Sequence, residues 1–151
     1  MKDPMRAYMK AGTIHHVSYP FLGGDENVKL ETLKKLLTDD YFDAVEVGHF
    51  SDPAVRKRAI AMIRTARMDS VAYGGQGLTL STGFNVNHLD AQERGKAVTA
   101  LKAGIDEAYE FGAYHFAFLA GRYEQSTIEA SFAALVDSTR ELCAYAASGH
   151  A

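Results

Sequence analysis

The sequence contains a single cysteine, Cys143, among its 151 residues. An intrachain disulfide is therefore excluded, and so is a metal cluster held by several thiolates. Cys143 falls at an apolar position of a helical pattern, and we expect it to be buried as a small hydrophobic side chain. We assign no chemical role to this residue.

Long apolar runs and an excess of one charge are also missing. No window approaches the roughly 18 uninterrupted apolar residues of a membrane span, and the opening stretch MKDPMRAYMKAG lacks the apolar core of a signal peptide. The 16 Lys and Arg residues nearly balance the 19 Asp and Glu residues, for a net charge of −3. These features disfavour a nucleic-acid partner and an anionic membrane, and we expect a cytoplasmic protein.

The chain does contain an alternation of strand-like and helix-like segments, repeated four times after a predicted lead-in segment at residues 1–9. The third strand is followed by the longest connection, QGLTLSTGFNVNHL, whose length is typical of a functional loop or lid. Strands are predicted at residues 11–20, 43–50, 70–75 and 114–121, and helices at residues 27–37, 53–66, 90–112 and 126–147.

Strands that alternate with helices predict a parallel sheet with crossover connections. Two architectures fit: an open sheet of the flavodoxin type, or part of a (β/α)₈ barrel. A full barrel typically takes about 250 residues, so four units are half of one. A phosphate-binding GxGxxG motif after the first strand is missing, and neither GKS nor GKT occurs.

The second strand, DAVEVGHF, favours the barrel. Alternation places Val45 and Val47 on one face and Ala44, Glu46 and Gly48 on the other. Valines that face helices and a small–Glu–small face turned inward suit a barrel interior. An inward carboxylate requires polar company or a cation, because a buried carboxylate without either would be protonated. The strand is therefore expected to end in a polar, concave site.

The ordered set of GTIHHVSYP, FDAVEVGHF, the long third connection and ERGKAVTALKAGIDEAYEFGAYHFAFLAG resembles the first half of the xylose isomerase-like TIM barrels. This superfamily includes sugar and sugar-phosphate isomerases and epimerases, inosose dehydratases, hydroxypyruvate isomerases and endonuclease IV. The resemblance covers the chain from about Lys10. It implies an α/β fold with about four of the eight (β/α) units, in which residues 10–151 form the N-terminal half of the barrel domain.

The resemblance implies an enzyme when the barrel is intact, namely a metal-dependent sugar or sugar-phosphate isomerase or epimerase that removes a proton beside a metal-polarised carbonyl. In such members a divalent metal (Mn, Mg, Co or Zn) is held by residues of strands five to eight, which this chain does not contain. We therefore assign no metal ligand here and expect the chain alone to be inactive. A polyol dehydratase of the same superfamily is an alternative.

In either architecture, functional residues gather at the carboxyl ends of the strands. Alternation along the first strand predicts that Ile14 points outward, while Thr13 and His15 point inward. We expect contacts to a sugar or polyol substrate from seven residues: His15, Glu46, His49, Tyr73, Gln76, His88 and Arg122.

Several of these residues have structural alternatives. Glu46 could pair with a basic residue of a neighbouring strand, and Arg122 with an acidic one. His49 and His88 could be solvent-exposed loop residues, whereas Tyr73 could belong to the core. These alternatives stay open at this point.

Two further readings concern the assembly and the nuclease members of the superfamily. A half-barrel with two unpaired strand edges could pair with a second copy as a non-catalytic homodimer, or it could need a missing C-terminal half. Endonuclease IV takes zinc-ligand histidines from the ends of its third and fourth strands. This chain has Gly74 and Gly75 at the first position and the residues LAG at the second, which disfavours a nuclease.

Overall fold

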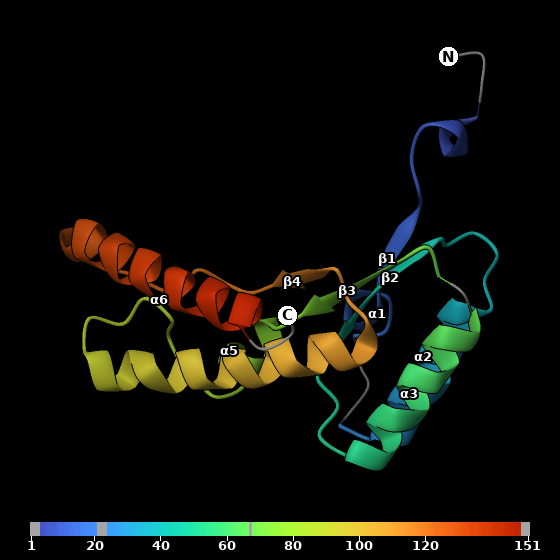
Figure 1. The fold of residues 1–151 in the computed structure, drawn as a ribbon, viewed down its shortest axis with the longest axis horizontal. Coiled ribbons are helices and arrows are strands. Elements are labelled where there is room, and N and C mark those ends of the chain that lie inside the picture. Colours follow the sequence, from blue (N-terminus) through green and yellow to red (C-terminus); the bar gives the residue numbers. More distant parts are fainter. Residues whose placement is uncertain (1–3, 21–23, 67, 149–151) are drawn as a thin grey trace.

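The computed structural model describes residues 4–20, 24–66 and 68–148. Its parallel strands are ordered in space as they are in the chain (Figure 1). They are β1 (Gly12–Ile14), β2 (Ala44–Gly48), β3 (Ser70–Gly74) and β4 (His115–Ala117). Within the described residues, β1 and β4 each pair on one side, so the sheet has two open edges.

The helices follow the strands as predicted, with additional short elements. In the predicted lead-in, Met5–Ala7 form the 3₁₀ turn η1, and residues 1–3 lie outside the described residues. The other elements are α1 (His15–Ser18), α2 (Glu26–Leu37), α3 (Pro53–Ala66), α4 (Gln76–Leu80), α5 (Ala91–Phe111), the 3₁₀ turn η2 (Gln125–Thr127) and α6 (Ile128–Ser148).

The helix ends are fixed by local chemistry. Asp52 precedes Pro53 and accepts a hydrogen bond from the backbone N–H of Ala54 at 2.7 Å. Asp90 caps α5 by accepting bonds from the second and third N–H groups of the helix. Gly112 ends α5 with a φ of +70°, a conformation that glycine adopts without steric cost. The predicted starts of these two helices are confirmed.

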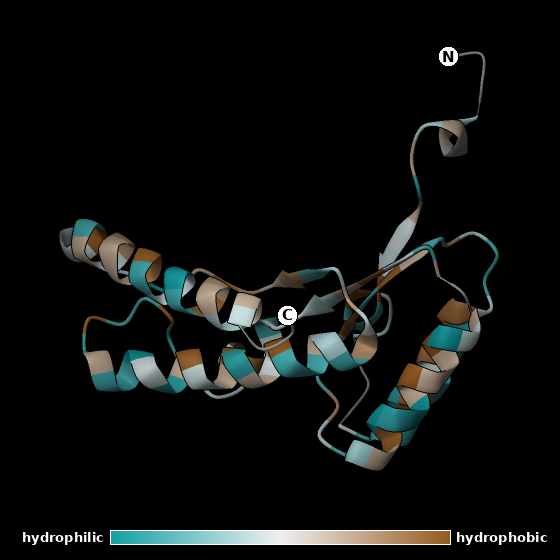
Figure 2. Cartoon of the chain, in the orientation of Figure 1, coloured by the Kyte–Doolittle hydropathy of each residue, from teal (hydrophilic) through white to brown (hydrophobic). Residues whose placement is uncertain are grey.

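The helices cover one face of the sheet. The valines of β2 pack with α2, α3 and the end of α5 in one apolar cluster, which includes Leu33 and Ala59. A second cluster joins α5 to α6 through Leu101 and Leu142. Figure 2 shows both apolar and polar residues around α3, α5 and α6, as expected for helices with one buried side. Within the described residues, no helix is both long and apolar enough to cross a membrane.

The first strand differs from the prediction. It ends at Ile14, and His15 begins the short helix α1. Thr13 lies beside Val45 and Ile14 beside Glu46, so Thr13 faces the helices and Ile14 lies on the opposite face. The predicted orientation of Ile14, Thr13 and His15 is therefore wrong. Three residues of strand carry too little pattern to fix the face, and a shift of one residue inverts it.

The long third connection is anchored rather than shaped as a free lid. It contains α4, and Val86 is 1% exposed within the cluster between α5 and α6. The Ser138 hydroxyl of α6 donates a hydrogen bond to the Val86 carbonyl at 2.8 Å. The connection is thus held from both sides and forms a wall beside the ends of β3 and β4.

Cys143 is exposed, which contradicts the predicted burial. The neighbouring Leu142 packs into the α5–α6 cluster, whereas Cys143 turns toward the open edge of the sheet. The helical pattern correctly marked an apolar face of α6, but within the described residues no element covers this part of it.

Candidate functional site

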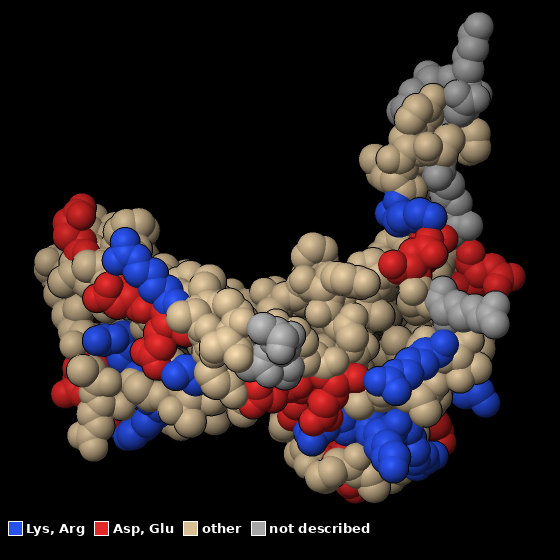
Figure 3. Space-filling model, viewed as in Figure 1, with Lys and Arg blue, Asp and Glu red and all other residues tan. Residues whose placement is uncertain are grey.

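The uncovered face of the sheet is concave and lined mainly by small side chains. Strand register places Glu46 in one row with Ala72, His115 and Ile14, and the next row toward the strand ends holds glycine and alanine. The predicted small–Glu–small face of β2, opposite its valines, is confirmed. Figure 3 shows mainly uncharged residues along the upper edge of the molecule, between α6 and the N-terminal segment. Lys, Arg, Asp and Glu lie over the helices.

Glu46 and Gln76 converge at the end of β3. Glu46 Oε1 and Gln76 Oε1 each lie 2.5 Å from the point where a Cβ on Gly74 would stand, so a side chain at this position would displace both oxygens. Both oxygens are buried, and neither has a hydrogen-bond partner within the described residues. Buried acceptors without a donor are costly. The arrangement therefore suits a hydroxyl, an amine or a cation that supplies the missing positive partner.

A second polar cluster lies between β2, β3, α3 and α5, and its centre is Glu107. One carboxylate oxygen accepts hydrogen bonds from His49 Nδ1 and Arg56 Nη1, both at 2.8 Å. The other accepts from the Tyr73 hydroxyl, also at 2.8 Å. Glu107 is 8% exposed, so this is a desolvated carboxylate with three donors. Arg56 Nε also contacts Glu110 at 2.9 Å.

The charges of this cluster follow from its contacts. Burial would raise the pKa of Glu107, but the bonds from His49 and Tyr73 and the charge of Arg56 outweigh it and hold this pKa below its ordinary value. Burial, followed by the charge of Glu107, raises the pKa of Tyr73. Glu107 is accordingly ionised at neutral pH, while Tyr73 keeps its proton.

Two residues expected in the pocket lie on the helix side instead. Tyr73 is fully buried among the helices, and its ring stacks on Phe116. His15 is 1% exposed, and its Nε2 lies 2.9 Å from the Thr32 hydroxyl of α2. Burial, aided by Lys29 and His16, lowers the pKa of His15 to about 4, so its ring is neutral. Tyr73 lies beside Val47 and shares its face by strand alternation, whereas His15 is turned toward α2 because helix α1 begins at this residue.

His88 and Arg122 come together as parts of one pocket of about 410 Å³ beyond the end of β4. The Asn85 side chain fixes this region by donating to the Arg122 carbonyl and accepting from the Arg122 N–H. His88 Nδ1 lies 3.0 Å from the backbone N–H of Asp90 and 3.4 Å from the Asp90 carbonyl, and the shorter contact favours the neutral ring with its proton on Nε2. The pocket thus combines donors of two kinds at the carboxyl end of the sheet.

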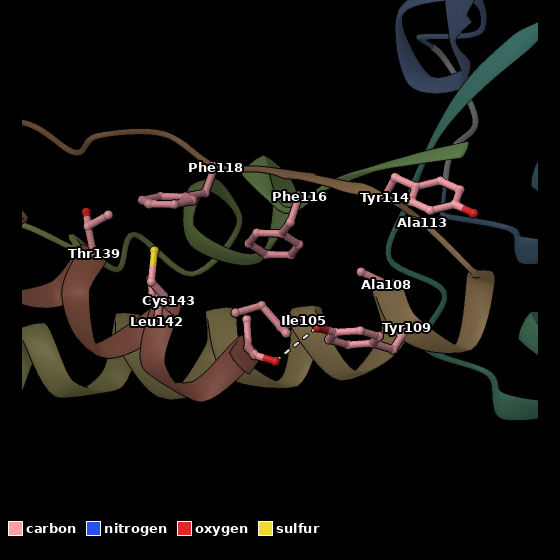
Figure 4. Close-up of a pocket in the computed structure, with 11 residues that line it drawn as sticks. Ile105, Ala108, Tyr109, Ala113, Tyr114, Phe116, Phe118, Thr139, Leu142 and Cys143 are labelled. Carbon is pink, nitrogen blue, oxygen red and sulfur yellow. Dashed lines mark hydrogen bonds between the residues drawn. The ribbon is translucent and has the colours of Figure 1, made fainter. Parts of the chain in front are cut away.

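An apolar groove of about 380 Å³ lies at the edge of β4, away from the concave face (Figure 4). Phe116 and Phe118 line one side, with residues of α5 and α6 opposite them. The Tyr109 hydroxyl closes one end by donating to the Ala146 carbonyl at 3.0 Å. Cys143 lies in this groove. The groove has no ionisable carboxylate or amine among its lining residues, so it suits packing rather than catalysis.

The sequence pattern missed Glu107 and Asn85. Glu107 lies on the buried stripe of α5 with Gly104 and Phe111, at spacings of three and four residues. A carboxylate on such a stripe signals a buried ion pair, and this signal was present in the sequence. Nothing local marks Asn85, because its partner Arg122 lies far along the chain.

A divalent metal does not fit the residues described here. No three His, Cys, Asp or Glu side chains gather in the part of the chain that the structure describes. On the concave face, Glu46 is a single carboxylate, and His115 lies two strands away, at roughly 10 Å from the strand spacing. The described part of this chain could contribute at most part of a metal site.

Comparison with known proteins agrees with this architecture. The chain matches the family model of the xylose isomerase-like TIM barrel over residues 29–149. No curated protein sequence matches it. A similar solved structure is D-psicose 3-epimerase with D-tagatose from Clostridium cellulolyticum H10, with a TM-score of 0.68 and 16% identity over 93% of this chain. This chain spans 49% of that protein, as four of eight βα units would. The chain therefore belongs to the xylose isomerase-like TIM barrel family and forms half of such a barrel.

Proposed function

We propose that this chain is the substrate-holding N-terminal half of a sugar or sugar-phosphate isomerase or epimerase. The observation that carries the proposal is the convergence of Glu46 and Gln76 over Gly74 on the concave face. A sugar hydroxyl would supply the donor that these two oxygens lack. Family membership supports this reading, because the superfamily includes enzymes of this kind.

Other residues at the same end of the sheet extend the proposed contact surface. His49 follows β2, and the pocket of His88 and Arg122 follows β4. Arg122 suits a phosphate or a sugar hydroxyl. Tyr73 and His15 are not part of this proposal, since both face the helices. The residues described here orient substrate, and the expected divalent metal of an intact enzyme would need ligands beyond them.

The proposal is tested by titrating the chain with D-tagatose, D-psicose and a ketohexose phosphate, followed by NMR chemical shifts. We expect shift changes near β2 and β3. The Glu46→Gln variant should bind about tenfold or more weakly, because a charged hydrogen bond contributes about 1.5–3 kcal/mol. Glu141→Gln, which changes an exposed carboxylate on α6, is the matched control and should bind like the wild type.

Two results would contradict this proposal. One is the absence of shift changes with every sugar tested. The other is sugar binding that Glu46→Gln leaves unchanged, since the ligand would then lie away from the concave face.

A second candidate function is assembly. The open edges of β1 and β4, together with the apolar groove beside β4, favour pairing with another half-barrel. We expect light scattering to give a mass of about twice 16.5 kDa if a second copy fills this role. In that dimer Cys143 should resist alkylation. A monomer with a reactive Cys143 would contradict self-assembly. The edge of β4 would then have to be covered by a different polypeptide segment.

A further inference from the structure

The contact between His49 and Glu107 determines which ring nitrogen of His49 carries the proton. Nδ1 lies 2.8 Å from Glu107 Oε1. Glu107 is ionised and can only accept hydrogen bonds, so the shared proton belongs to His49 Nδ1. In the neutral ring, Nε2 then has a free lone pair. His49 thus presents an acceptor, in contrast to His88.

The carboxylate that sets this tautomer is itself rigidly held. Arg56 Nη1 and the Tyr73 hydroxyl bind Glu107 from α3 and β3, and the Glu107 side chain is 10% exposed. His49 is different, because its side chain is 42% exposed. A buried carboxylate that is held by two other donors therefore orients a partly exposed imidazole. Such an arrangement is typical of histidines that handle protons or hold ligands.

His49 also has a fixed backbone at the carboxyl end of the sheet. It follows Gly48, the last residue of β2, which lies beside Gly74 of β3. The Lys29 ammonium donates to the His49 carbonyl and lies 4.0 Å from the centre of the Phe50 ring. The main chain is thus held from α2 while the side chain is held from α5. Rotation of the imidazole would break the bond to Glu107.

We propose that Glu107 is a positioning residue that fixes the partly exposed His49, which follows the carboxyl end of β2, with Nε2 as a hydrogen-bond acceptor for a hydroxyl of the sugar. This inference rests on the proposed function for the ligand, but not for the tautomer. It assigns a role to Glu107, which lies on a helix outside the concave face. Arg56 and Tyr73 support it by donating to the same carboxylate from α3 and β3.

The tautomer can be measured in the free chain without any ligand. Nitrogen-15 NMR of the histidine side chains distinguishes protonated from unprotonated ring nitrogens, and a His49→Gln variant identifies the His49 signals. We expect Nδ1 to be protonated and Nε2 unprotonated in the neutral ring. Glu107→Gln should lower the share of this tautomer, whereas Glu110→Gln, which alters the other acidic partner of Arg56, should not. If Glu107→Gln fails to fold, the wild-type tautomer alone decides.

Sugar titrations then separate the two proposals. If His49 receives a hydroxyl, His49→Gln and Glu107→Gln should weaken binding about fivefold or more, and Glu110→Gln should leave it unchanged. A neutral wild-type His49 ring with its proton on Nε2 would overturn the positioning role, whether or not the chain binds the sugar. The expected tautomer in a chain that binds no sugar would instead support the positioning role and overturn the proposed function.

Discussion

Replacing Glu107 with alanine is expected to lower the free energy of unfolding by about 3–5 kcal/mol, the range found when one partner of a buried ion pair is removed. The carboxylate is 8% exposed and accepts bonds from Arg56, His49 and Tyr73. Its loss leaves the buried Tyr73 hydroxyl without its acceptor, and leaves the partly buried guanidinium of Arg56 with only Glu110 and the Phe50 carbonyl. Urea unfolding of the variant and the wild type measures this difference.

Glu110→Ala is the matched control for this prediction. It removes the other carboxylate that contacts Arg56, but its side chain is 49% exposed, so the expected loss is at most about 1 kcal/mol. An equal effect of both substitutions would mean that the Glu107 cluster is no more important to stability than a surface ion pair.

The destabilisation expected for Glu107→Ala depends on pH, and the sign of this dependence follows from the pKa of Glu107. The pKa of folded Glu107 lies below its ordinary value, whereas an unfolded glutamate titrates near about 4.3. The contribution of Glu107 is therefore complete above about pH 4.3 and is lost as the pH falls through the lower folded pKa. The stability difference between wild type and Glu107→Ala should narrow in acid. A constant difference between pH 7 and pH 3 would contradict the ionised state of Glu107.

Leu101→Ala is expected to cost about 3 kcal/mol, within the range for large-to-small substitutions in a core. Leu101 is fully buried where α5 meets Val86 of the long connection and Leu142 of α6. The resulting cavity should loosen all three segments together. Thermal unfolding measures the loss, and hydrogen exchange of the Val86 amide measures the loosening.

Leu80→Ala serves as the control, because Leu80 is 59% exposed at the end of α4. Its expected effect lies within about 0.5 kcal/mol. A similarly small effect of Leu101→Ala would show that the α5–α6 cluster adjusts to the lost volume.

The alternation of apolar and polar residues was sufficient to predict the two faces of the second strand. The second strand has five residues of strict alternation, so Val45 and Glu46 could be assigned to opposite faces, and the structure agrees. The first strand has three residues in the structure. The two adjacent histidines that follow it did not indicate which face of the first strand is buried. His15 was therefore assigned to the pocket, although it faces α2.

The remaining misses concern contacts between distant segments. Tyr73 could be interpreted as either a ring for a sugar or a core residue, and its register beside Val47 of β2 together with its bond to Glu107 of α5 places it in the core. The burial of Cys143 was inferred from the helix alone, but burial depends on what lies beside β4. Local patterns predict which face of an element is apolar. They do not predict what covers that face.

The order of the strands bears on synthesis at the ribosome. Because β1, β2, β3 and β4 lie side by side in the order in which they are made, each new strand meets a partner that has already emerged. After β1, which pairs with β2, none of the described strands has to wait for a later one before it can pair, and folding can advance from the N-terminus as the chain lengthens. The exposed edge moves forward with each added strand, and β4 is the last of the described strands to form it.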